Sequence, residues 1–380
     1  MLDLLTLLTA ILACAGLIQG VLGLRALRRF SLEPVVQPAA RPPVTVLKPL
    51  FGDEPLLEIA LTSFCIQTYP DYQIVFGVQD PADPALAVIG RLRALFPERD
   101  IGVVVDPTPH GANRKVANLI NMLPAAKHDV LVIADADLHA PPSYLERIVA
   151  ALQAPGAGLV TTLYTGFPGV PGLPARLGAS QINHVFLPGV LLARAMGRQD
   201  CLGATMALTR GTLGRIGGLP ALAPHLADDN MLGRLVRGQG LRIALARTVP
   251  ATTVPEASLA ALWRHELRWA RTIRALVPVQ FALSSLQYPL VWALASLALS
   301  RLDEGAVILF IGAWALRAAL VRAIDRALGL ARTLPVWLLP VREVLSFLVL
   351  LAGFAGNRVE WRGQMARADR ARLVPGRPAS

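Results

Sequence analysis

The stretch Asp129-Val-Leu-Val-Ile-Ala-Asp-Ala-Asp137 contains a fully apolar run that ends in two carboxylates one residue apart. A short apolar run of this kind predicts a strand that is buried on both faces, as in parallel sheets covered by helices. In such sheets ligands bind beyond the carboxyl ends of the strands. The stretch therefore predicts an α/β fold, with Asp135 and Asp137 at the ligand-binding edge of the sheet.

Strand and helix patterns alternate on the amino-terminal side of this run. Apolar runs predict strands over 44–47, 73–78 and 101–105, and helical spacing predicts helices over 55–68, 83–96 and 115–122. Strands that alternate with helices predict a mostly parallel, Rossmann-like sheet. We therefore expect an α/β domain over residues 41–255.

The composition indicates that this domain is attached to a membrane. Of the 380 residues, 54% are hydrophobic and only 17% are charged, whereas soluble chains carry about 25% charged residues. These figures exclude a disordered or collagen-like chain. Three scattered cysteines, Cys14, Cys65 and Cys201, are too few for a disulfide framework or a thiolate metal site.

The net charge of +11 fits a nucleic acid, an anionic membrane surface or a phosphorylated substrate as partner. The basic residues gather beside the apolar runs, and no basic patch is interleaved with aromatic residues for base stacking. We therefore expect a membrane and a phosphorylated substrate, and no nucleic acid.

The first 30 residues predict a transmembrane anchor. Residues 4–24 carry no charge and are long enough to span a bilayer core of about 30 Å. Only Asp3 precedes the run, whereas Arg25, Arg28 and Arg29 follow it. By the positive-inside rule the N-terminus lies outside and the α/β domain lies in the cytoplasm. A cleaved signal peptide, the alternative, would have positive charge before a shorter run.

Three further apolar runs lie between residues 277 and 356. The runs 277–300 and 306–320 predict a transmembrane hairpin. The run 334–356 is interrupted by Pro340 and by Arg342-Glu343, and the tail 357–380 carries six arginines against two acids. Since both flanks of this last run belong inside, we expect a re-entrant or interfacial hairpin broken near Pro340. A full crossing that breaks the charge rule is the alternative. The whole pattern predicts a multi-pass membrane protein.

The Asp135-Ala-Asp137 pair is the first candidate site. Hard cations such as Mg²⁺ bind a few carboxylate oxygens and keep positions open for substrate phosphates. Alternatively, one of the two carboxylates caps the turn before Pro141-Pro142.

Three more polar groups are candidate site residues. Asp80 follows the strand 73–78 and fits a contact with a nucleotide, or a cap for the next helix. The segment 111–115 opens a helix with Lys115, which fits either a diphosphate cradle or a solvated turn. Asp228 and Asp229 precede an apolar helix. Neighbouring carboxylates raise one another's pKa, which suits a general base. Negative charges also suit the N-terminus of a helix, which is the alternative.

Residues 256–276 are dense in tryptophan and arginine just before a membrane run. This composition predicts an interfacial amphipathic helix. Its cations would also fit a phosphate group, and its aromatic rings would fit an acceptor substrate. A helix at the membrane interface can do both, so the two interpretations are compatible.

Taken in order, these elements resemble the signature of membrane-bound, family-2-like glycosyltransferases of GT-A fold: an Asp, an Asp-x-Asp, a (Thr/Glu)-Asp and a (Gln/Arg)-x-x-Arg-Trp. The corresponding elements are Asp80, Asp135-Ala-Asp137, Asp228-Asp229 and His265-Glu-Leu-Arg-Trp269. In detail the chain resembles the ceramide glucosyltransferase group (family 21), and within it the bacterial hopanoid-biosynthesis glycosyltransferases. Supporting stretches are Leu47-Lys-Pro-Leu50, Asn113-Arg-Lys-Val-Ala-Asn118, Gly217-Gly-Leu219 and the tail motif Trp361-Arg-Gly363.

The resemblance implies a role for each residue that matches the signature. Asp80 would contact the uridine, Lys115 the base or phosphates, Asp135 the nucleotide, and Asp137 the metal and diphosphate. On the acceptor side, Asp229 would be the base, while Arg268 and Trp269 would bind the diphosphate and wall the acceptor site. Two positions depart from the pattern: Asp228 replaces Glu or Thr, and His265 replaces Gln or Arg.

The implied activity is inverting transfer of a hexose, glucose or N-acetylglucosamine, from a UDP-sugar to the hydroxyl of a membrane lipid, either ceramide or a hopanoid. The implied cofactor is Mg²⁺ or Mn²⁺, held by Asp137 and Asp135. A polyprenyl-phosphate sugar transferase, a processive polysaccharide synthase and a non-enzymatic membrane-anchored binding protein are the alternatives.

Overall fold

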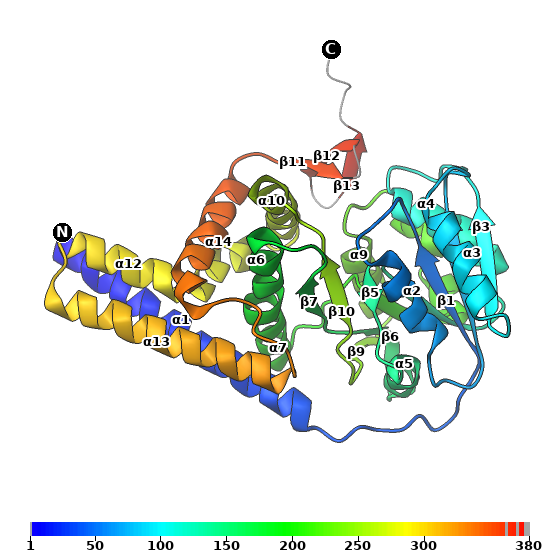
Figure 1. Ribbon diagram of the computed structural model, residues 1–380, viewed down its shortest axis with the longest axis horizontal. Coiled ribbons are helices and arrows are strands. Elements are labelled where there is room, and N and C mark those ends of the chain that lie inside the picture. The colour runs from blue at the N-terminus through cyan, green and yellow to red at the C-terminus, as the bar shows by residue number, and fades with distance from the viewer. Residues whose placement is uncertain (1, 362–363, 370–371, 376–380) are drawn as a thin grey trace, which may run out of the picture. The chain divides into compact units, whose positions relative to one another are not determined.

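The computed structural model describes residues 2–361, 364–369 and 372–375 (Figure 1). The chain divides into two compact units. The first, which we call the sheet unit, contains Pro34–Thr165 and Gln199–Pro255; the second, the helical unit, contains Met1–Glu33, Gly166–Arg198 and Glu256–Arg370. The stretch 41–255 expected for the α/β domain is thus interrupted by residues 166–198.

A seven-stranded sheet forms the centre of the sheet unit, in the order β3-β2-β1-β4-β8-β6-β9. Its strands are β1 Val44–Pro49, β2 Tyr72–Val78, β3 Asp100–Val105, β4 Val130–Ala134, β6 Ala157–Thr161, β8 Thr205–Thr209 and β9 Arg242–Leu245. β8 runs antiparallel to β4 and β6, whereas the other neighbouring strands are parallel. The predicted mostly parallel α/β sheet is therefore confirmed, with each expected strand within two residues of its predicted bounds.

Helices cover both faces of this sheet, which explains the apolar strands. In β4, Val130 and Val132 pack on one face, while Leu131 and Ile133 pack on the other, as the two-residue period of a strand requires. The first face is covered by α2 Leu57–Cys65, α3 Ala85–Leu95 and α5 Tyr144–Leu152; the second is covered by α4 Arg114–Met122, α8 Arg210–Arg215 and α9 Asp228–Gly238. Beyond β4, the short strand β5 Leu138–His139 pairs antiparallel with β10 Ala251–Val254.

In the helical unit, α1 Leu2–Leu32, α12 Pro289–Leu299 and α13 Glu304–Ala327 pack side by side (Figure 1). The remaining helices are α6 Leu173–Gln181, the π-helix η2 Ile182–Phe186, α7 Leu187–Ala195, α10 Leu259–Leu276, α11 Pro278–Leu283, η4 Ser284–Gln287, η5 Val336–Leu338 and α14 Leu339–Phe354. Four further strands lie outside the seven-stranded sheet: β7 Thr165–Pro168, β11 Arg358–Trp361, β12 Gln364–Asp369 and β13 Arg372–Pro375. β11 and β12 form an antiparallel pair. Arg362 and Gly363 of the tail motif, and part of the tail 357–380, lie outside the described residues.

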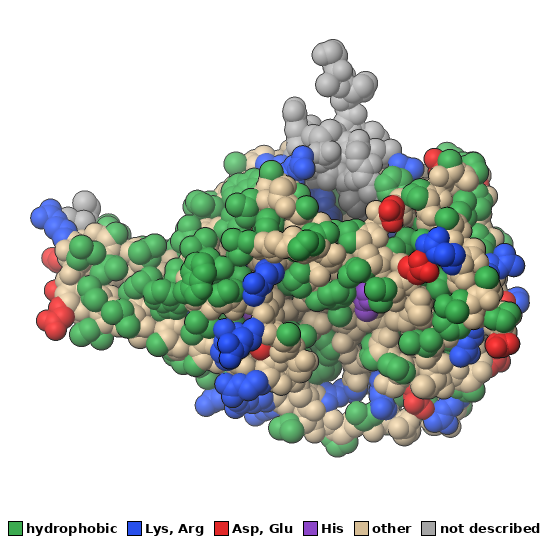
Figure 2. All heavy atoms as spheres, in the orientation of Figure 1, with side chains coloured by type: hydrophobic (Ala, Val, Ile, Leu, Met, Phe, Trp, Pro, Cys, Tyr) green, Lys and Arg blue, Asp and Glu red, His purple; other side chains and the backbone are tan. Residues whose placement is uncertain are grey.

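The helical unit carries helices suited to a membrane. Among the described residues, Asp3–Leu32, Glu304–Ala327 and Val336–Phe354 are long and apolar enough to cross a bilayer, and the bent pair Pro278–Gln287 and Pro289–Leu299 adds a fourth if it counts as one span. Figure 2 shows a largely hydrophobic surface over α12 and α13, where Ile308 and Ile311 are exposed. Exposed aliphatic residues on long helices are typical of contact with lipid, so the chain is associated with a membrane.

The break expected near Pro340 is not found there. Pro340 lies in the first turn of α14, which continues to Phe354 without interruption. Proline is tolerated at that position because its missing N–H would have no partner in the helix. The bend occurs instead at Pro289, where the two helices of the pair meet at 70°.

Candidate active site

The turn after β4 directs the two aspartates of the Asp-x-Asp motif differently. The Asp135 N–H donates to the Ala204 carbonyl at 3.2 Å, and the Asp135 side chain is 35% exposed. The Oδ2 of Asp137 accepts a hydrogen bond of 2.5 Å from the hydroxyl of Thr252 on β10. Both aspartates are half-buried, so the motif offers two partly accessible carboxylates with different partners.

The Asp137 carboxylate is in an unfavourable electrostatic position when it is ionised. Burial, followed by the negative charge of Asp135, raises the pKa of Asp137 above its usual value. Two carboxylates this close repel each other when both are ionised. Cation binding would relieve that repulsion.

Lys48 on β1 supplies a positive charge behind the motif. Its side chain is fully buried, and its Nζ donates to the carbonyl oxygen of Asp135 at 2.7 Å. The ammonium also lies 3.6 Å from the centre of the Phe64 ring. Burial lowers the pKa of Lys48 to about 7, although Asp137 and Asp135 act in the opposite direction.

Lys115, in the first turn of α4, joins two of the acidic elements. Its Nζ lies 2.6 Å from Oδ1 of Asp135 and 3.9 Å from Oδ2 of Asp228. Burial alone would lower the pKa of Lys115, but the carboxylates of Asp135 and Asp228 raise it above its usual value. The solvated turn that was one interpretation of this segment is therefore wrong, because Lys115 is buried.

Asn113 fixes the start of α4 against the loop that leads to Asp228. Its Oδ1 accepts the N–H of Val116 at 3.1 Å, which caps the helix, and its Nδ2 donates to the His225 carbonyl at 2.8 Å. Gly111 has a φ of +115° and comes so close to Ala223 that a Cβ would lie 3.2 Å from that side chain. The Gly-x-Asn-x-Lys sequence thus positions Lys115 beside the acids.

Asp228 and Asp229 open α9, where the helix dipole favours negative charge. Oδ2 of Asp228 is buried without a hydrogen-bond partner among the described residues. The Asn230 N–H donates to Oδ1 of Asp229 at 2.7 Å, and the absent side chain of Gly203 leaves room for Oδ2. Burial, followed by the charge of Asp228, raises the pKa of Asp229 to about 7.

Asp80 lies at the same sheet edge, beyond the end of β2. Its Oδ1 accepts the Ala82 N–H at 2.8 Å, so its side chain closes a local turn and does not cap α3. The N-cap of α3 is Pro84, and the Ala85 N–H donates instead to Oδ1 of Asp83 at 2.9 Å. Asp80 is exposed, and β1 alone separates its strand from β4.

His265, Arg268 and Trp269 lie on α10 in the helical unit. The His265 ring packs edge-on against Trp269, with 4.7 Å between ring centroids, and its Nδ1 is hydrogen-bonded to the buried carboxylate of Glu256. The predicted helix 256–276 corresponds to α10, which begins at Leu259 after the N-cap Ser258.

The structure therefore joins Lys115, Asp135 and Asp228 directly, with Asp137 and Asp229 in electrostatic contact with the same group. Sequence reasoning missed three polar partners: Lys48, Thr252 and Glu256. A lysine inside a strand that is otherwise buried, in Leu47-Lys-Pro-Leu50, was an available signal for the first. Thr252 lies far in sequence from Asp137, so no local pattern marks their contact. Glu256 lies only nine residues before His265, at the start of the stretch 256–276, but outside the helix that carries the histidine.

The acidic cluster fits a divalent cation only together with a substrate. Within the described residues, no group of three or more His, Cys, Asp and Glu side chains has the arrangement of a metal site. Asp135 and Asp137 offer carboxylate oxygens, which hard cations prefer. This donor set fits a cation that takes its remaining ligands from phosphates and water.

A sequence model of the glycosyl transferase family 21 matches residues 8–374. The chain belongs to glycosyl transferase family 21. The resemblance found in the sequence is confirmed at this level. The family-21 chain is 32% identical over 114 residues to a ceramide glucosyltransferase of Komagataella phaffii, covering 29% of this chain and 22% of that protein. It is 21% identical over 266 residues to ceramide glucosyltransferase 1 of Caenorhabditis elegans, covering 68% of this chain and 56% of that protein.

The family-21 chain thus spans between about a fifth and about half of the length of these curated relatives. Among solved structures it is similar to a mannosyltransferase of Pyrobaculum calidifontis in complex with GDP-mannose and Mn²⁺. The TM-score is 0.53 at 20% sequence identity, with 93% of this chain and 99% of that chain covered. This likeness supports the predicted GT-A-type fold.

Proposed function

We propose that the family-21 chain transfers a hexose, glucose or N-acetylglucosamine, from a UDP-sugar to the hydroxyl of a membrane lipid, ceramide or a hopanoid, with inversion at the anomeric carbon. The observation that carries the proposal is the half-buried Asp229, whose pKa is raised to about 7, in the same electrostatic cluster as Lys115 and Asp135. A carboxylate with that pKa is matched to proton abstraction near neutral pH.

On the donor side, four residues are proposed to bind the nucleotide diphosphate. Asp80 contacts the uridine, Asp135 holds the nucleotide, and Lys115 neutralises phosphate charge. A Mg²⁺ or Mn²⁺ ion held by Asp137 and Asp135 would neutralise the charge that develops on the departing diphosphate. The close approach of Lys115 to Asp135 supports this assignment, because the lysine lies where a phosphate would need a cation.

On the acceptor side, Asp229 takes the proton from the lipid hydroxyl as that oxygen attacks the anomeric carbon opposite the diphosphate. Asp228 keeps the pKa of Asp229 high by its negative charge. Attack from the face opposite the leaving group inverts the configuration.

The helix α10 is proposed to complete the site with Arg268 on the diphosphate and Trp269 against the acceptor. His265 is proposed as a donor-side residue oriented by Glu256. The apolar helices of the same unit would keep the lipid acceptor in the bilayer while its hydroxyl reacts.

We further propose that the chain is a multi-pass protein of a bacterial inner membrane, with the sheet unit in the cytoplasm and the N-terminus outside. The arginines that follow the apolar part of α1 support this orientation. UDP-sugars are then available to the sheet unit directly.

The test is incubation of membranes containing the full chain with labelled UDP-glucose and UDP-N-acetylglucosamine, each with ceramide and with a hopanoid polyol. Mass spectrometry of the lipid extract should reveal one glycolipid, proton NMR should show its inverted anomeric configuration, and Asp229→Asn membranes should lack it. A polyprenyl-phosphate sugar or a polysaccharide as the product would instead establish one of the alternative activities.

A further inference from the structure

The Asp229 carboxylate has one oxygen with a hydrogen-bond partner and one without. Its Oδ1 accepts the Asn230 N–H at 2.7 Å, whereas no hydrogen bond reaches its Oδ2 from the described part of the chain. Asp229 is half-buried, and its Oδ2 is not enclosed in the way that Oδ2 of Asp228 is. A base must come within hydrogen-bond reach of the proton that it abstracts. Oδ2 is therefore the oxygen with room for an acceptor hydroxyl.

Gly203 is the residue that faces this oxygen. A Cβ at position 203 would lie 3.0 Å from Oδ2 of Asp229 and 3.4 Å from its Cγ, which is closer than most side chains approach a neighbour. The φ angle of Gly203 is not positive, so the backbone conformation alone does not demand glycine. The close approach to the Asp229 carboxylate is therefore what favours glycine at this position.

The loop that carries Gly203 packs against helix α9 at two points. Asp229 and Gly233 lie about one turn apart on α9, and they meet Gly203 and Cys201 respectively. A Cβ on Gly233 would lie 3.0 Å from the Cβ of Cys201. The second contact is thus also close, and it keeps Gly203 opposite the base.

Thr161 on β6 holds the same loop from the side of the sheet. Its fully buried hydroxyl accepts the Leu202 N–H at 2.9 Å, and the carbonyl oxygens of Leu202 and Thr205 lie 2.9 and 3.0 Å from it as acceptors. Moving the loop would leave buried polar groups without partners, which is costly. A side chain at position 203 would therefore displace the Asp229 carboxylate and not the loop.

We propose that Oδ2 of Asp229 is the atom that takes the acceptor proton, and that Gly203 is a positioning residue that keeps this oxygen open. The inference rests on the proposed function, in which Asp229 is the base. As the acceptor oxygen forms its bond to the anomeric carbon, the bond to the diphosphate breaks and its electron pair leaves with UDP. The hydroxyl proton passes to Oδ2 through the space that a side chain at position 203 would occupy.

Gly203→Ala tests this role in the purified full chain in phosphatidylcholine nanodiscs. Transfer is measured with UDP-glucose and with UDP-N-acetylglucosamine, each on ceramide and on a hopanoid polyol. The added methyl group lies where the acceptor hydroxyl would approach, so kcat should fall about 10- to 100-fold. The Kd of UDP, measured by calorimetry, should stay unchanged. General damage to the site would instead weaken UDP binding together with kcat.

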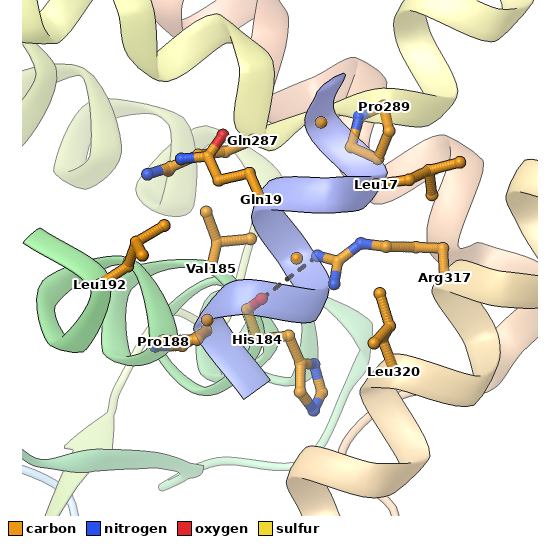
Figure 3. Close-up of a pocket in the computed structure, with 14 residues that line it drawn as sticks. Leu17, Gln19, His184, Val185, Pro188, Leu192, Gln287, Pro289, Arg317 and Leu320 are labelled. Carbon is orange, nitrogen blue, oxygen red and sulfur yellow. Dashed lines mark hydrogen bonds between the residues drawn. The ribbon is translucent and has the colours of Figure 1, made fainter. Parts of the chain in front are cut away.

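Gly20→Ala is the matched control, because it creates the same crowding elsewhere. Gly20 lines a small hollow of about 30 Å³ in the helical unit, and a Cβ there would lie 3.0 Å from Leu320, which Figure 3 labels. The helical unit contains none of the acids of the cluster. The control should therefore keep the kcat and the UDP affinity of the parent. A fall in kcat as large as that of Gly203→Ala would overturn the proposal.

Carbodiimide coupling gives a measurement that does not depend on catalysis. In the parent without nucleotide, a carbodiimide and glycine ethyl ester should label Asp229 through its open oxygen, with the exposed Asp53 as internal reference. Gly203→Ala should lose most of the labelling at Asp229 and keep that at Asp53, as peptide mass spectrometry would show. An unlabelled Asp229 in the parent would overturn the proposal whether or not the variant folds. Equal labelling of parent and variant would overturn it as well.

The two measurements separate the inference from the proposed function. If the parent transfers sugar and Gly203→Ala keeps the parent kcat, the inference is wrong and the proposed function stands. If the parent transfers sugar to neither lipid, the proposed function fails. The labelling of Asp229 then still decides whether Gly203 keeps Oδ2 open.

Discussion

The ammonium group of Lys48 lies 2.7 Å from the carbonyl oxygen of Asp135, so a fully buried cation holds the backbone of the Asp-x-Asp turn. The neighbouring acids oppose the fall in the pKa of Lys48 that burial causes. The turn and the lysine are therefore interdependent: the lysine fixes the carbonyl, and the acids stabilise its charge.

Lys48→Met should reduce kcat/KM by about 10- to 100-fold, since a misplaced donor-binding group costs that much without contact to the reacting atoms. The variant also leaves the Asp135 carbonyl unpaired, which lowers the free energy of unfolding by about 1–3 kcal/mol. Kinetics and thermal unfolding measure the two effects. Glu58→Gln, an equally simple change in an exposed ion pair with Arg91, is the control that should leave both nearly unchanged. An unchanged kcat/KM in Lys48→Met would contradict the positioning role.

The transfer rate should fall as the pH drops below about 7, because Asp229 acts as a base only when it is ionised and its pKa is about 7. Asp228→Asn removes the nearby negative charge that raises this pKa, and the acidic limb of the profile should therefore move to lower pH. Rates measured from pH 5 to 9 at saturating donor and acceptor test both statements. An unshifted profile in Asp228→Asn would assign the limb to another group.

Asp229→Asn should abolish transfer, with a loss of at least about 100-fold, while UDP still binds. The same variant should be more stable than the parent at pH 8 and gain less at pH 5. The sign follows from the raised pKa: the protonated form is favoured in the folded state, and this stabilisation is complete below the usual Asp pKa of 3.8 and is lost as the pH rises to about 7. Melting temperatures at the two pH values measure the difference, and an equal change at both would contradict it.

Asp137→Asn should weaken the binding of UDP in the presence of Mn²⁺ and have a smaller effect in EDTA, because the substitution removes a charged metal ligand. Calorimetric titration of UDP with and without Mn²⁺ separates the two contributions. Thr252→Val is the comparison variant, since it removes only the hydroxyl that donates to Asp137 and should produce a partial loss. If EDTA changes neither binding nor rate in the parent chain, the metal assignment is wrong.

The sequence predicted the sheet well because strands such as β4 are apolar on both faces and end in charged residues. The same local signal placed Asp135 and Asp137 at the sheet edge. It could not reveal that Asp137 pairs with Thr252, because that contact joins residues far apart in the chain. Pro340 was misinterpreted for a related reason, since a proline at the first turn of a helix and one in its middle look alike until the start of the helix is known.

Arg342 and Glu343 were expected to interrupt an apolar run, yet each charge has a partner on another helix. Arg342 Nη2 lies 2.7 Å from Glu266 on α10, and the two side chains are 3% and 10% exposed. Arg342→Met leaves the Glu266 carboxylate buried without its partner and should lower the free energy of unfolding by about 3–5 kcal/mol. Arg342→Met/Glu266→Met removes both charges and should recover most of that loss, because two apolar side chains can replace a buried ion pair at little cost. The coupling energy is measured by thermal unfolding, in phosphatidylcholine nanodiscs, of the parent, Arg342→Met, Glu266→Met and the double variant. Strictly additive changes in the free energy of unfolding would show that the ion pair does not fix α10, the helix that carries Arg268 and Trp269.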